Sequence, residues 1–329
     1  MDVSIVVPAR NAADTLGQCL DALLVNSDAG ESYEVIVVDD GSSDDTRDVA
    51  NSRPVRVLSQ KHEGPAAARN RGVAEARGHI ILFTDADCVP AVSWVSEMTR
   101  PFLDAEIVGV KGAYRTRQAG IVPRFVQCEY EERYQRMATL KRIDFIDTYS
   151  AGYRRAVFRS AGGFDTRYPS ASVEDQELSF RLAEQGYQMV FNPLAVVYHR
   201  HPETVGAYFR RKFNIGYWKV RLLRSHPQKA MRDSHTPQAL KVQMALALIV
   251  LPLLALAVIR TWFAWLAAPT ALAFVISSIP FTIKALRRDL VVGLVAPFLL
   301  LVRAVALGSG MIIGMWDLAI GRDGIDQNA

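Results

Sequence analysis

Short apolar runs alternate with amphipathic stretches through the first hundred residues of this chain. The apolar runs predict strands at 3–7, 34–38, 55–58, 79–84 and 107–112. The amphipathic stretches between them predict helices at 14–24, 46–50, 65–76 and 91–103. Strands that are apolar throughout and are joined by helices are typical of a parallel sheet covered on both faces. The pattern therefore predicts an α/β fold with a mostly parallel central sheet.

The alternation continues less regularly to about residue 200. Further elements are expected as helices at 121–140 and 173–184 and as strands at 188–192 and 196–198. Three glycines, Gly152, Gly162 and Gly163, predict turns in the intervening stretch.

From Pro202 onward aromatic residues recur every four positions, with basic residues between them. Phe209, Phe213 and Tyr217 form this series. The spacing predicts an amphipathic helix lying on a membrane surface. An aromatic stripe packed in a protein core has the same spacing and remains the alternative.

Three apolar segments follow, at 242–259, 262–283 and 290–316. About 20 apolar residues suffice for a helix to span a bilayer. Only Arg260 and Thr261 separate the first two segments, which predicts a tight helical hairpin. Arg303 interrupts the third, so that segment is expected either to be re-entrant or to turn this charge toward protein. Burial of all three in a soluble domain is the competing interpretation.

This reading divides the chain into four parts: 1–201, an α/β domain; 202–238, a basic interfacial segment; 239–320, a membrane region of two to three helices or a hairpin plus a re-entrant segment; and 321–329, a polar tail. Lys284, Arg287 and Arg288 follow the second apolar segment. By the positive-inside rule their loop is cytoplasmic. The expected location is the inner (plasma) membrane, multi-pass, with the N-terminal domain in the cytoplasm.

Charge and composition agree with this division. The net charge is +4, and a mean hydropathy of +0.08 averages over two unlike halves. Basic residues gather just before the apolar region, and these are Arg210, Arg211, Lys212, Lys219, Arg221, Arg224, Lys229 and Arg232. Their position favours anionic membrane lipids rather than nucleic acid as a partner. Three scattered cysteines give no disulfide framework and fit a reducing compartment. The first residues contain no stretch typical of a signal peptide.

Acidic clusters follow the predicted strands at the edge of a parallel sheet where ligands bind. Asp39 and Asp40 follow the second strand, and Asp85 and Asp87 follow the fourth. Two extended residues that are two positions apart point the same way, so both carboxylates of the second pair can face one site. Neither a dinucleotide-binding glycine fingerprint nor a P-loop is present. Repeated carboxylates instead predict a hard divalent cation, Mg²⁺ or Mn²⁺.

Six motifs occur in order along the chain: SIVVPARN at 4–11, VVDDGSSDDT at 37–46, GPAAARNRG at 64–72, FTDAD at 83–87, GGFD at 162–165 and VEDQEL at 173–178. They resemble the successive motifs of family 2 glycosyltransferases. The match covers about residues 3–200. The resemblance implies the GT-A fold, a single nucleotide-binding α/β domain, with the membrane helices appended after it.

The resemblance also implies roles for individual residues. The nucleotide-sugar is expected to contact Pro8, Ala9, Arg10, Asp39, Asp40, Arg69, Asp85, Ala86, Glu174, Arg210 and Arg211. Asp87 is expected to bind the metal, with Asp85 and His199 beside it. Structural interpretations stay open at several of these positions. The Asp40-Gly41 pair is typical of a turn. His199 can be a core or surface residue, and Arg210 and Arg211 can belong to a basic helix that faces lipid.

Asp175 is the expected general base, because inverting transfer needs a carboxylate that deprotonates the acceptor hydroxyl. The acids Glu174 and Asp175 also suit the first turn of a helix, so capping is the alternative. If the acceptor is a lipid phosphate, no base is needed, and Asp175 would position the acceptor.

The sequence thus predicts an inverting, metal-dependent transferase that moves a sugar from a nucleotide-sugar, with UDP favoured. The acceptor is expected to be lipid-linked or a saccharide, in polysaccharide or glycolipid synthesis. A polyprenyl-phosphate sugar synthase using a UDP- or GDP-sugar is an alternative. A membrane scaffold with a vestigial nucleotide-sugar-binding domain is the non-enzymatic alternative. The Q-x-x-R-W motif of processive relatives is absent, which argues against processive polymer synthesis and translocation.

Overall fold

The computed structural model describes residues 2–25, 32–168, 172–230, 234 and 236–322. Two compact units make up the chain. The sheet unit contains the described residues of 2–117 and 134–200, and the helical unit contains those of 118–133 and 201–322. The predicted lipid-facing Arg232 and the tail from 323 lie outside the described residues.

The sheet unit contains eight strands: β1 Val3–Ala9, β2 Tyr33–Asp40, β3 Arg56–Gln60, β4 Ile80–Phe83, β5 Val89–Pro90, β6 Ile107–Arg115, β7 Ala151–Arg154 and β8 Gln188–Tyr198. Its helices are α1 Ala13–Leu24, α2 Thr46–Asn51, α3 Pro65–Glu75, α4 Trp94–Thr99, α6 Arg155–Ser160 and α7 Glu174–Glu184, with 3₁₀ turns η2 Arg100–Leu103 and η3 Thr148–Ser150. Helix α5, Ile121–Met137, belongs partly to each unit.

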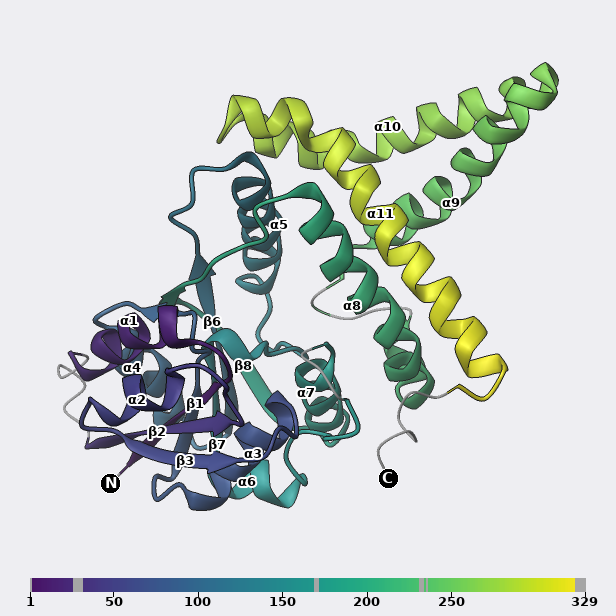
Figure 1. The fold of residues 1–329 in the computed structure, drawn as a ribbon. Coiled ribbons are helices and arrows are strands. Elements are labelled where there is room, and N and C mark those ends of the chain that lie inside the picture. The colour runs from purple at the N-terminus through teal and green to yellow at the C-terminus, as the bar shows by residue number, and fades with distance from the viewer. Residues whose placement is uncertain (1, 26–31, 169–171, 231–233, 235, 323–329) are drawn as a thin grey trace. The chain divides into compact units, whose positions relative to one another are not determined.

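The strand order is β3-β2-β1-β4-β7-β6-β8-β5 (Figure 1). The first four strands are mutually parallel, as are β6 and β8. Strand β7 runs antiparallel to both of its neighbours, and β5 runs antiparallel to β8. The prediction of a mostly parallel α/β sheet is confirmed. The strands predicted at 188–192 and 196–198 are one irregular strand, β8.

One predicted turn is wrong. Gly152 lies in the middle of strand β7, between Leu82 of β4 and Val110 of β6. A Cβ atom there would lie 2.9 Å from the Leu82 side chain and 3.1 Å from that of Met98, so the close packing around this strand favours glycine. Gly162 and Gly163 do lie in turns, at φ angles of +85° and +70°.

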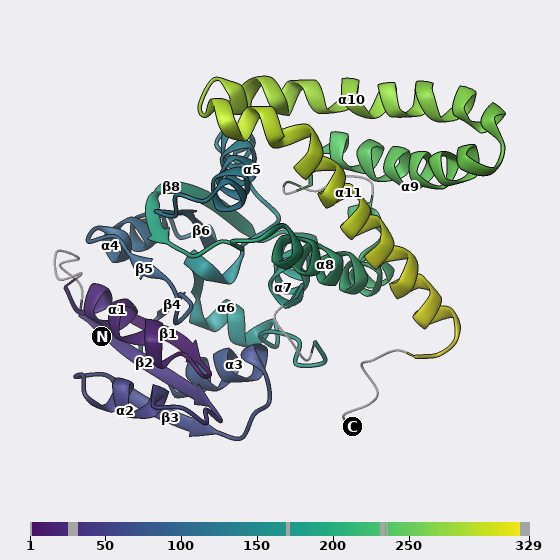
Figure 2. The same ribbon diagram turned by 45° about the horizontal axis from the view of Figure 1, so that its top comes forward.

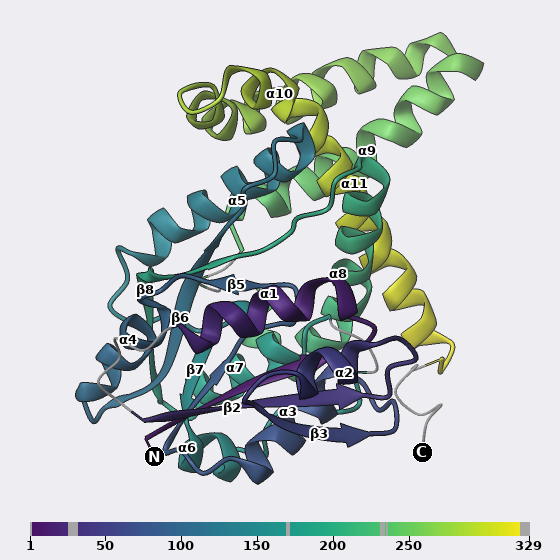
Figure 3. The same cartoon turned by 60° about the vertical axis from the view of Figure 1, so that its left-hand side comes forward.

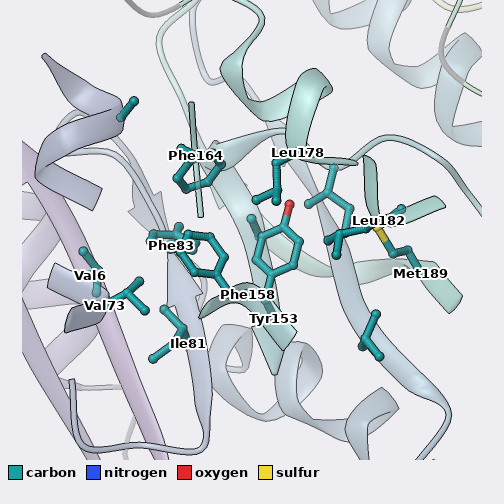
Figure 4. Packing of buried hydrophobic residues seen from close by; sticks show 14 of the residues in the cluster. Val6, Val73, Ile81, Phe83, Tyr153, Phe158, Phe164, Leu178, Leu182 and Met189 are labelled. Atoms are coloured by element: carbon teal, nitrogen blue, oxygen red, sulfur yellow. The ribbon is translucent and has the colours of Figure 1, made fainter. Parts of the chain in front are cut away.

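Aromatic side chains from separate motifs form the core beside strand β4 (Figure 4). The Phe83 ring lies 5.4 Å from Phe164, 5.6 Å from Phe158 and 6.2 Å from Tyr153, measured between ring centres. All four side chains are buried. Phe83 lies two residues before Asp85, so this packing fixes the base of the acidic segment at 85–87.

The helical unit contains α8 Val205–Ser225, α9 Gln238–Ile259, α10 Ala264–Leu286 and α11 Leu290–Ala319, with 3₁₀ turns η4 Pro227–Ala230 and η5 Thr261–Phe263. Helices α9 and α10 form the predicted hairpin (Figure 2). Three helices in the described part of the chain are long and apolar enough to cross a membrane. Large apolar side chains are exposed along α9 and α10, so burial in a soluble domain is wrong for this pair.

The third apolar segment is a single continuous helix, α11, and not a re-entrant hairpin. Arg303 is buried in protein, as the other expectation stated. Its Nη1 donates to Glu129 Oε1 at 2.8 Å, and its Nη2 donates to Gln243 Oε1 at 2.7 Å. Glu129 comes from α5 and Gln243 from α9, so three helices meet at this buried charge cluster.

Helix α8 was predicted as an amphipathic helix on a membrane surface, but two of its basic residues lie elsewhere than expected. Lys212 and Arg221, which we expected to lie among lipid head groups, are buried. Lys212 Nζ lies 3.1 Å from Glu129 Oε2, and Arg221 donates to the backbone oxygen of Arg322. The aromatic series Phe209, Phe213 and Tyr217 is only half-buried. The buried positions 208, 212 and 216 lie one residue ahead of it. Tyr208 and Lys212 contact Glu129 of α5, and Gly216 lies against Leu307 of α11.

Glycines bring the backbones of α8 and α11 into direct contact (Figure 3). A Cβ atom on Gly310 would lie 2.2 Å from the backbone oxygen of Phe213, and one on Gly314 would lie 2.5 Å from that of Tyr217. Gly216 of α8 approaches Leu307 in the same way.

We therefore expect Gly310→Ala to destabilise the protein by about 1–3 kcal/mol, because the helices must separate. Gly206→Ala is the matched control. It also adds one methyl group to a glycine of this unit, but meets only the end of the Arg210 side chain at 3.7 Å. Thermal unfolding in detergent should lower the melting temperature of the first variant only. Equal melting temperatures would contradict the close packing.

Candidate active site

The loops after β1 and β2 are held together by side-chain hydrogen bonds. Asn11 adopts a left-handed conformation, with φ of 47°, which asparagine tolerates better than most residues. Its backbone N–H donates to Ser42 Oγ at 3.0 Å, and its Oδ1 accepts from the Ser43 N–H at 2.9 Å. The preceding residue, Arg10, is exposed, whereas Ala9 is buried. This arrangement places Arg10 at the carboxyl edge of the sheet.

Asp39 and Asp40 follow one another but have different surroundings. Asp39 Oδ1 accepts one hydrogen bond from the Ser42 N–H, at 3.1 Å. Asp40 accepts four, from Gln60, His62, Glu63 and Gly64, all between 2.8 and 3.0 Å.

Burial by itself would raise the pKa of Asp40, but these four donors hold it below its usual range. Asp40 therefore fixes the loop that leads into α3. Contact of Asp40 with a nucleoside stays a prediction. Asp39 accepts fewer hydrogen bonds from the protein than Asp40, so its carboxylate has more capacity to bind a ligand.

Arg69 joins two acidic segments of the site. It extends from α3 and is 2% exposed. Its Nη2 donates to Asp85 Oδ1 at 2.8 Å, and its Nη1 donates to Glu174 Oε1 at 3.2 Å. The guanidinium group also lies over the Phe164 ring. We expected Arg69 near the base or the diphosphate, but the structure encloses it in protein, where it sets the distance between β4 and α7.

Asp175 lies one residue after Glu174, in the first turn of α7. Burial raises its pKa well above the usual range for an aspartate, and the neighbouring carboxylates of Glu174 and Asp147 raise it further. Arg69 and the Gln176 N–H, which donates to Asp175 Oδ1 at 2.7 Å, oppose this shift. A carboxyl group with a raised pKa is well matched to accepting a proton.

A second acidic group meets a histidine at the far side of β4. Asp87 Oδ2 lies 3.5 Å from His199 Nε2, and possible ligand atoms of Asp87, Cys88 and His199 all lie within 4.8 Å of one another. The short strand β5 makes this possible, because Val89 pairs with Tyr198, the residue before His199. His199 is held between the rings of Tyr149 and Tyr114.

These residues fit a divalent cation. Asp87 is half-exposed and supplies carboxylate oxygens, and His199 supplies a ring nitrogen that Mn²⁺ accepts readily. Cys88 is a buried thiol, and burial, followed by the charges of Asp85 and Asp87, raises its pKa well above the usual range. Asp85, predicted as a further ligand, is instead paired with Arg69.

Other predicted residues lie elsewhere. Arg210 and Arg211 are on α8 in the helical unit, so their contact with a nucleotide-sugar stays a prediction. Pro8 is half-buried and Ala86 is buried, both at strand ends of the sheet unit. His201, which follows the same strand as His199, is buried and stacks on Tyr130 in the helical unit.

Two residues near the site had no signal in the sequence. Cys88 adjoins the acidic pair but carries no motif of its own. Asp147 forms a buried ion pair with Lys111 and raises the pKa of Asp175. The position of Asp147 near the site becomes evident only because η3, which follows it, packs against β6.

Comparisons with known proteins agree with this arrangement. Residues 4–162 match the profile described as Glycosyl transferase family 2. The chain is 30% identical over 243 residues to the Pre-mycofactocin glycosyltransferase of Mycobacterium tuberculosis, a match that covers 69% of this chain and 49% of that protein. It is 28% identical over 237 residues to the Probable glycosyltransferase YdaM of Bacillus subtilis, covering 64% of this chain and 53% of that one. The chain thus spans about half the length of these relatives.

Among solved structures, the chain is similar to the mannosyltransferase PcManGT from Pyrobaculum calidifontis, solved in complex with GDP-Man and Mn²⁺. The TM-score is 0.61 at 20% identity, covering 96% of this chain and 87% of that one. The sheet order, the acidic strand ends and the family match together show that the chain belongs to glycosyltransferase family 2 and has the GT-A fold.

Proposed function

We propose that this protein is an inverting, metal-dependent glycosyltransferase that moves a sugar from a nucleotide-sugar to a membrane-associated acceptor. One observation carries the proposal. Arg69 links Asp85, at the end of β4, to Glu174, beside Asp175 at the start of α7. The metal-binding segment and the proton acceptor are thus held at fixed positions within one unit.

Each group has a separate task in this proposal. Asp87 and His199 hold a divalent cation, with Asp85 beside them through the same short segment. When bound, the cation neutralises charge on the diphosphate leaving group. Asp175 accepts the proton of the acceptor hydroxyl, and Arg10 and Asp39 at the neighbouring strand ends contact the nucleotide.

The acceptor is proposed to be a lipid-linked sugar or a membrane saccharide in glycolipid or polysaccharide synthesis. The three apolar helices support membrane attachment, and a polyprenyl-linked acceptor is confined to the same bilayer. We place the protein in the inner membrane with the catalytic domain in the cytoplasm, since Lys284, Arg287 and Arg288 follow α10. A polyprenyl phosphate is the alternative acceptor.

A donor screen tests the proposal. Membranes containing the protein, Mn²⁺ or Mg²⁺ and radiolabelled UDP- or GDP-sugars should transfer label to the lipid fraction. UDP is favoured, although PcManGT was solved with GDP-Man and the more distant GalNAc-T7 with UDP. Absence of label with every donor would contradict the proposal.

Loss of the metal site should be measurable without turnover. Asp87→Asn is expected to lower Mn²⁺ affinity about 10-fold or more, because one anionic oxygen ligand is removed. Titration calorimetry with Mn²⁺ measures this directly. Asp48→Asn, on helix α2, changes an exposed acid away from the site and is the matched control. Equal affinities of the two variants would argue against Asp87 as a ligand.

The pH dependence of transfer should reflect the raised pKa of Asp175. A general base works only when deprotonated, so the rate falls as the pH drops through its pKa. We expect this acid limb at a higher pH than an ordinary aspartate would give. Glu174→Gln removes a neighbouring negative charge and frees Arg69, so the limb should move to lower pH. If the acid limb of the pH profile does not move, it reports the pKa of another group.

A further inference from the structure

We infer that only the α9–α10 hairpin crosses the bilayer, and that α8 lies on the membrane surface together with the C-terminal half of α11. The chain would then cross the membrane twice, and its C-terminal end would lie on the same side as the catalytic domain. The partner of the helical unit is a lipid bilayer. Helices α9 and α10 span it, and α8 and the C-terminal half of α11 lie on its surface.

The first observation is that the protein buries different fractions of the three apolar helices. Only 17% of the most apolar window of α9 and 22% of that of the second segment are buried within the protein, against 50% for α11. A helix that is half covered by protein presents less surface to lipid than its hydropathy suggests. Composition alone therefore overstates the similarity of α11 to the other two.

Helices α9 and α10 contact α11, but its largest contact is with a strongly basic helix. Helix α8 carries six basic residues, which are Arg210, Arg211, Lys212, Lys219, Arg221 and Arg224. It is held to α11 by backbone contacts at Gly310 and Gly314, and Tyr217 Oη donates to Asp317 Oδ2 at 2.8 Å. If this half of α11 crossed the bilayer, α8 would have to enter the hydrocarbon with it. Charged side chains are rare at that depth, because their transfer from water is costly.

Hydrogen bonds and ion pairs lie at both ends of the contact between α8 and α11. Arg221 donates to the backbone oxygen of Arg322 near the end of the described chain. At the other end, Glu129 of α5 contacts both Lys212 of α8 and Arg303 of α11. The half of α11 that follows Arg303 is therefore bounded by charged groups at both ends, which suits a helix lying in the interface.

The exposed face of this half is nevertheless apolar. Ile312, Ile313, Met315 and Trp316 are each about half-exposed or more. One face packed on a basic helix and the opposite face apolar is the arrangement of an interfacial helix. The remaining part of α11, Leu290 to Val302, is about 20 Å long at 1.5 Å per residue, which is too short to cross a core of roughly 30 Å.

The hairpin has the opposite character. Helices α9 and α10 contain 22 and 23 residues and are therefore about 33 and 35 Å long. Trp262 and Trp265 lie exposed at the hairpin tip, where a tryptophan belt at the far interface would be. The α9–α10 hairpin and the C-terminal half of α11 extend in different directions in all three views (Figures 1–3). The two cannot both run straight through the same bilayer.

Cysteine labelling of the full chain in sealed membranes tests this topology. In a Cys128→Ser background, single cysteines replace Leu140 in the catalytic domain, Thr261 at the hairpin tip and Ile320 at the end of α11. All three positions are exposed. A membrane-impermeant maleimide should reach Ile320→Cys and Leu140→Cys from one side and Thr261→Cys from the other. The Cys128→Ser parent gives the background from Cys19 and Cys88, which are buried.

Two outcomes would overturn the inference. Labelling of Ile320→Cys from the side of Thr261→Cys would mean that α11 crosses. Labelling of Thr261→Cys from the side of Leu140→Cys would mean that the hairpin does not cross. An epitope added after Ala329, probed by antibody on right-side-out and inside-out vesicles, checks the C-terminal side without altering α11. Neither measurement uses transfer activity, so the result is separate from that of the donor screen.

Discussion

Asp175→Asn is expected to lower the rate of sugar transfer by about 10²- to 10⁴-fold, the range usual for loss of a general base. Asparagine keeps the size of the side chain but cannot accept the acceptor proton. Donor affinity should stay nearly unchanged, because the proposed nucleotide contacts at Arg10 and Asp39 lie on other strand ends. Single-turnover transfer and calorimetric binding of the donor measure the two effects separately.

The matched control is Glu184→Gln, at the exposed far end of the same helix. It removes one carboxylate from α7 without touching the site and should transfer at the original rate. Undiminished transfer by Asp175→Asn would refute the role of base and would favour a lipid phosphate acceptor, which needs none. A loss of donor binding together with transfer would instead indicate that α7 has been displaced.

The largest expected effect on stability is at Glu129, the only carboxylate in contact with Lys212 and Arg303 among the described residues. Its side chain is 1% exposed and also accepts a hydrogen bond from Tyr208 at 3.0 Å. Burial alone would raise the pKa of Glu129, but the surrounding cations lower it to about 2, so it stays ionised. Glu129→Gln leaves two buried cations without a counter-charge and should cost about 3–5 kcal/mol.

Glu132→Gln provides the comparison, because it lies three residues further along α5. Its partner is Lys284 at 3.0 Å, and that lysine is half-exposed. An exposed pair of this kind contributes about 0–1 kcal/mol, so the control should unfold at nearly the original temperature in detergent. Adding Lys212→Met to Glu129→Gln should recover part of the loss, since one unpaired cation is removed. Equal melting temperatures of the two single variants would show that the cluster is solvated.

Patterning was sufficient to predict most elements in the first half of the chain. The strands that became β1, β2 and β4 contain continuous apolar runs, and such runs do not depend on distant partners for recognition. Strand β7 was not predicted because Gly152 was interpreted locally as a turn residue. Only the approach of the Leu82 side chain explains a glycine there.

The candidate site was predictable as a set of residues but not as an arrangement. The strand-end acids were identified from position and resemblance, and the structure does bring Asp87 to His199. For Arg69 and Asp40 the sequence could not distinguish a ligand-binding role from a structural one. Both were predicted to contact the nucleotide-sugar. In the structure Arg69 is paired with two acidic residues, and Asp40 accepts hydrogen bonds from four protein donors. Burial of a polar side chain depends on segments far away in the sequence.

The membrane region shows the same limit. Hydropathy identified three similar segments, but it gave no indication that α8 would cover one of them. That covering depends on Gly310 and Gly314, whose significance appears only when a second backbone lies against them.

The two-residue strand β5 has a consequence for the order of assembly during synthesis. Asp87 and His199 are more than a hundred positions apart, and the pairing of Val89 with Tyr198 brings them together. A nascent chain therefore cannot form the proposed cation site until the ribosome has made β8, after strands β1 to β7 have emerged. The early sheet must reach its shape without help from a bound ion, so metal starvation should reduce activity and leave folded yield unchanged.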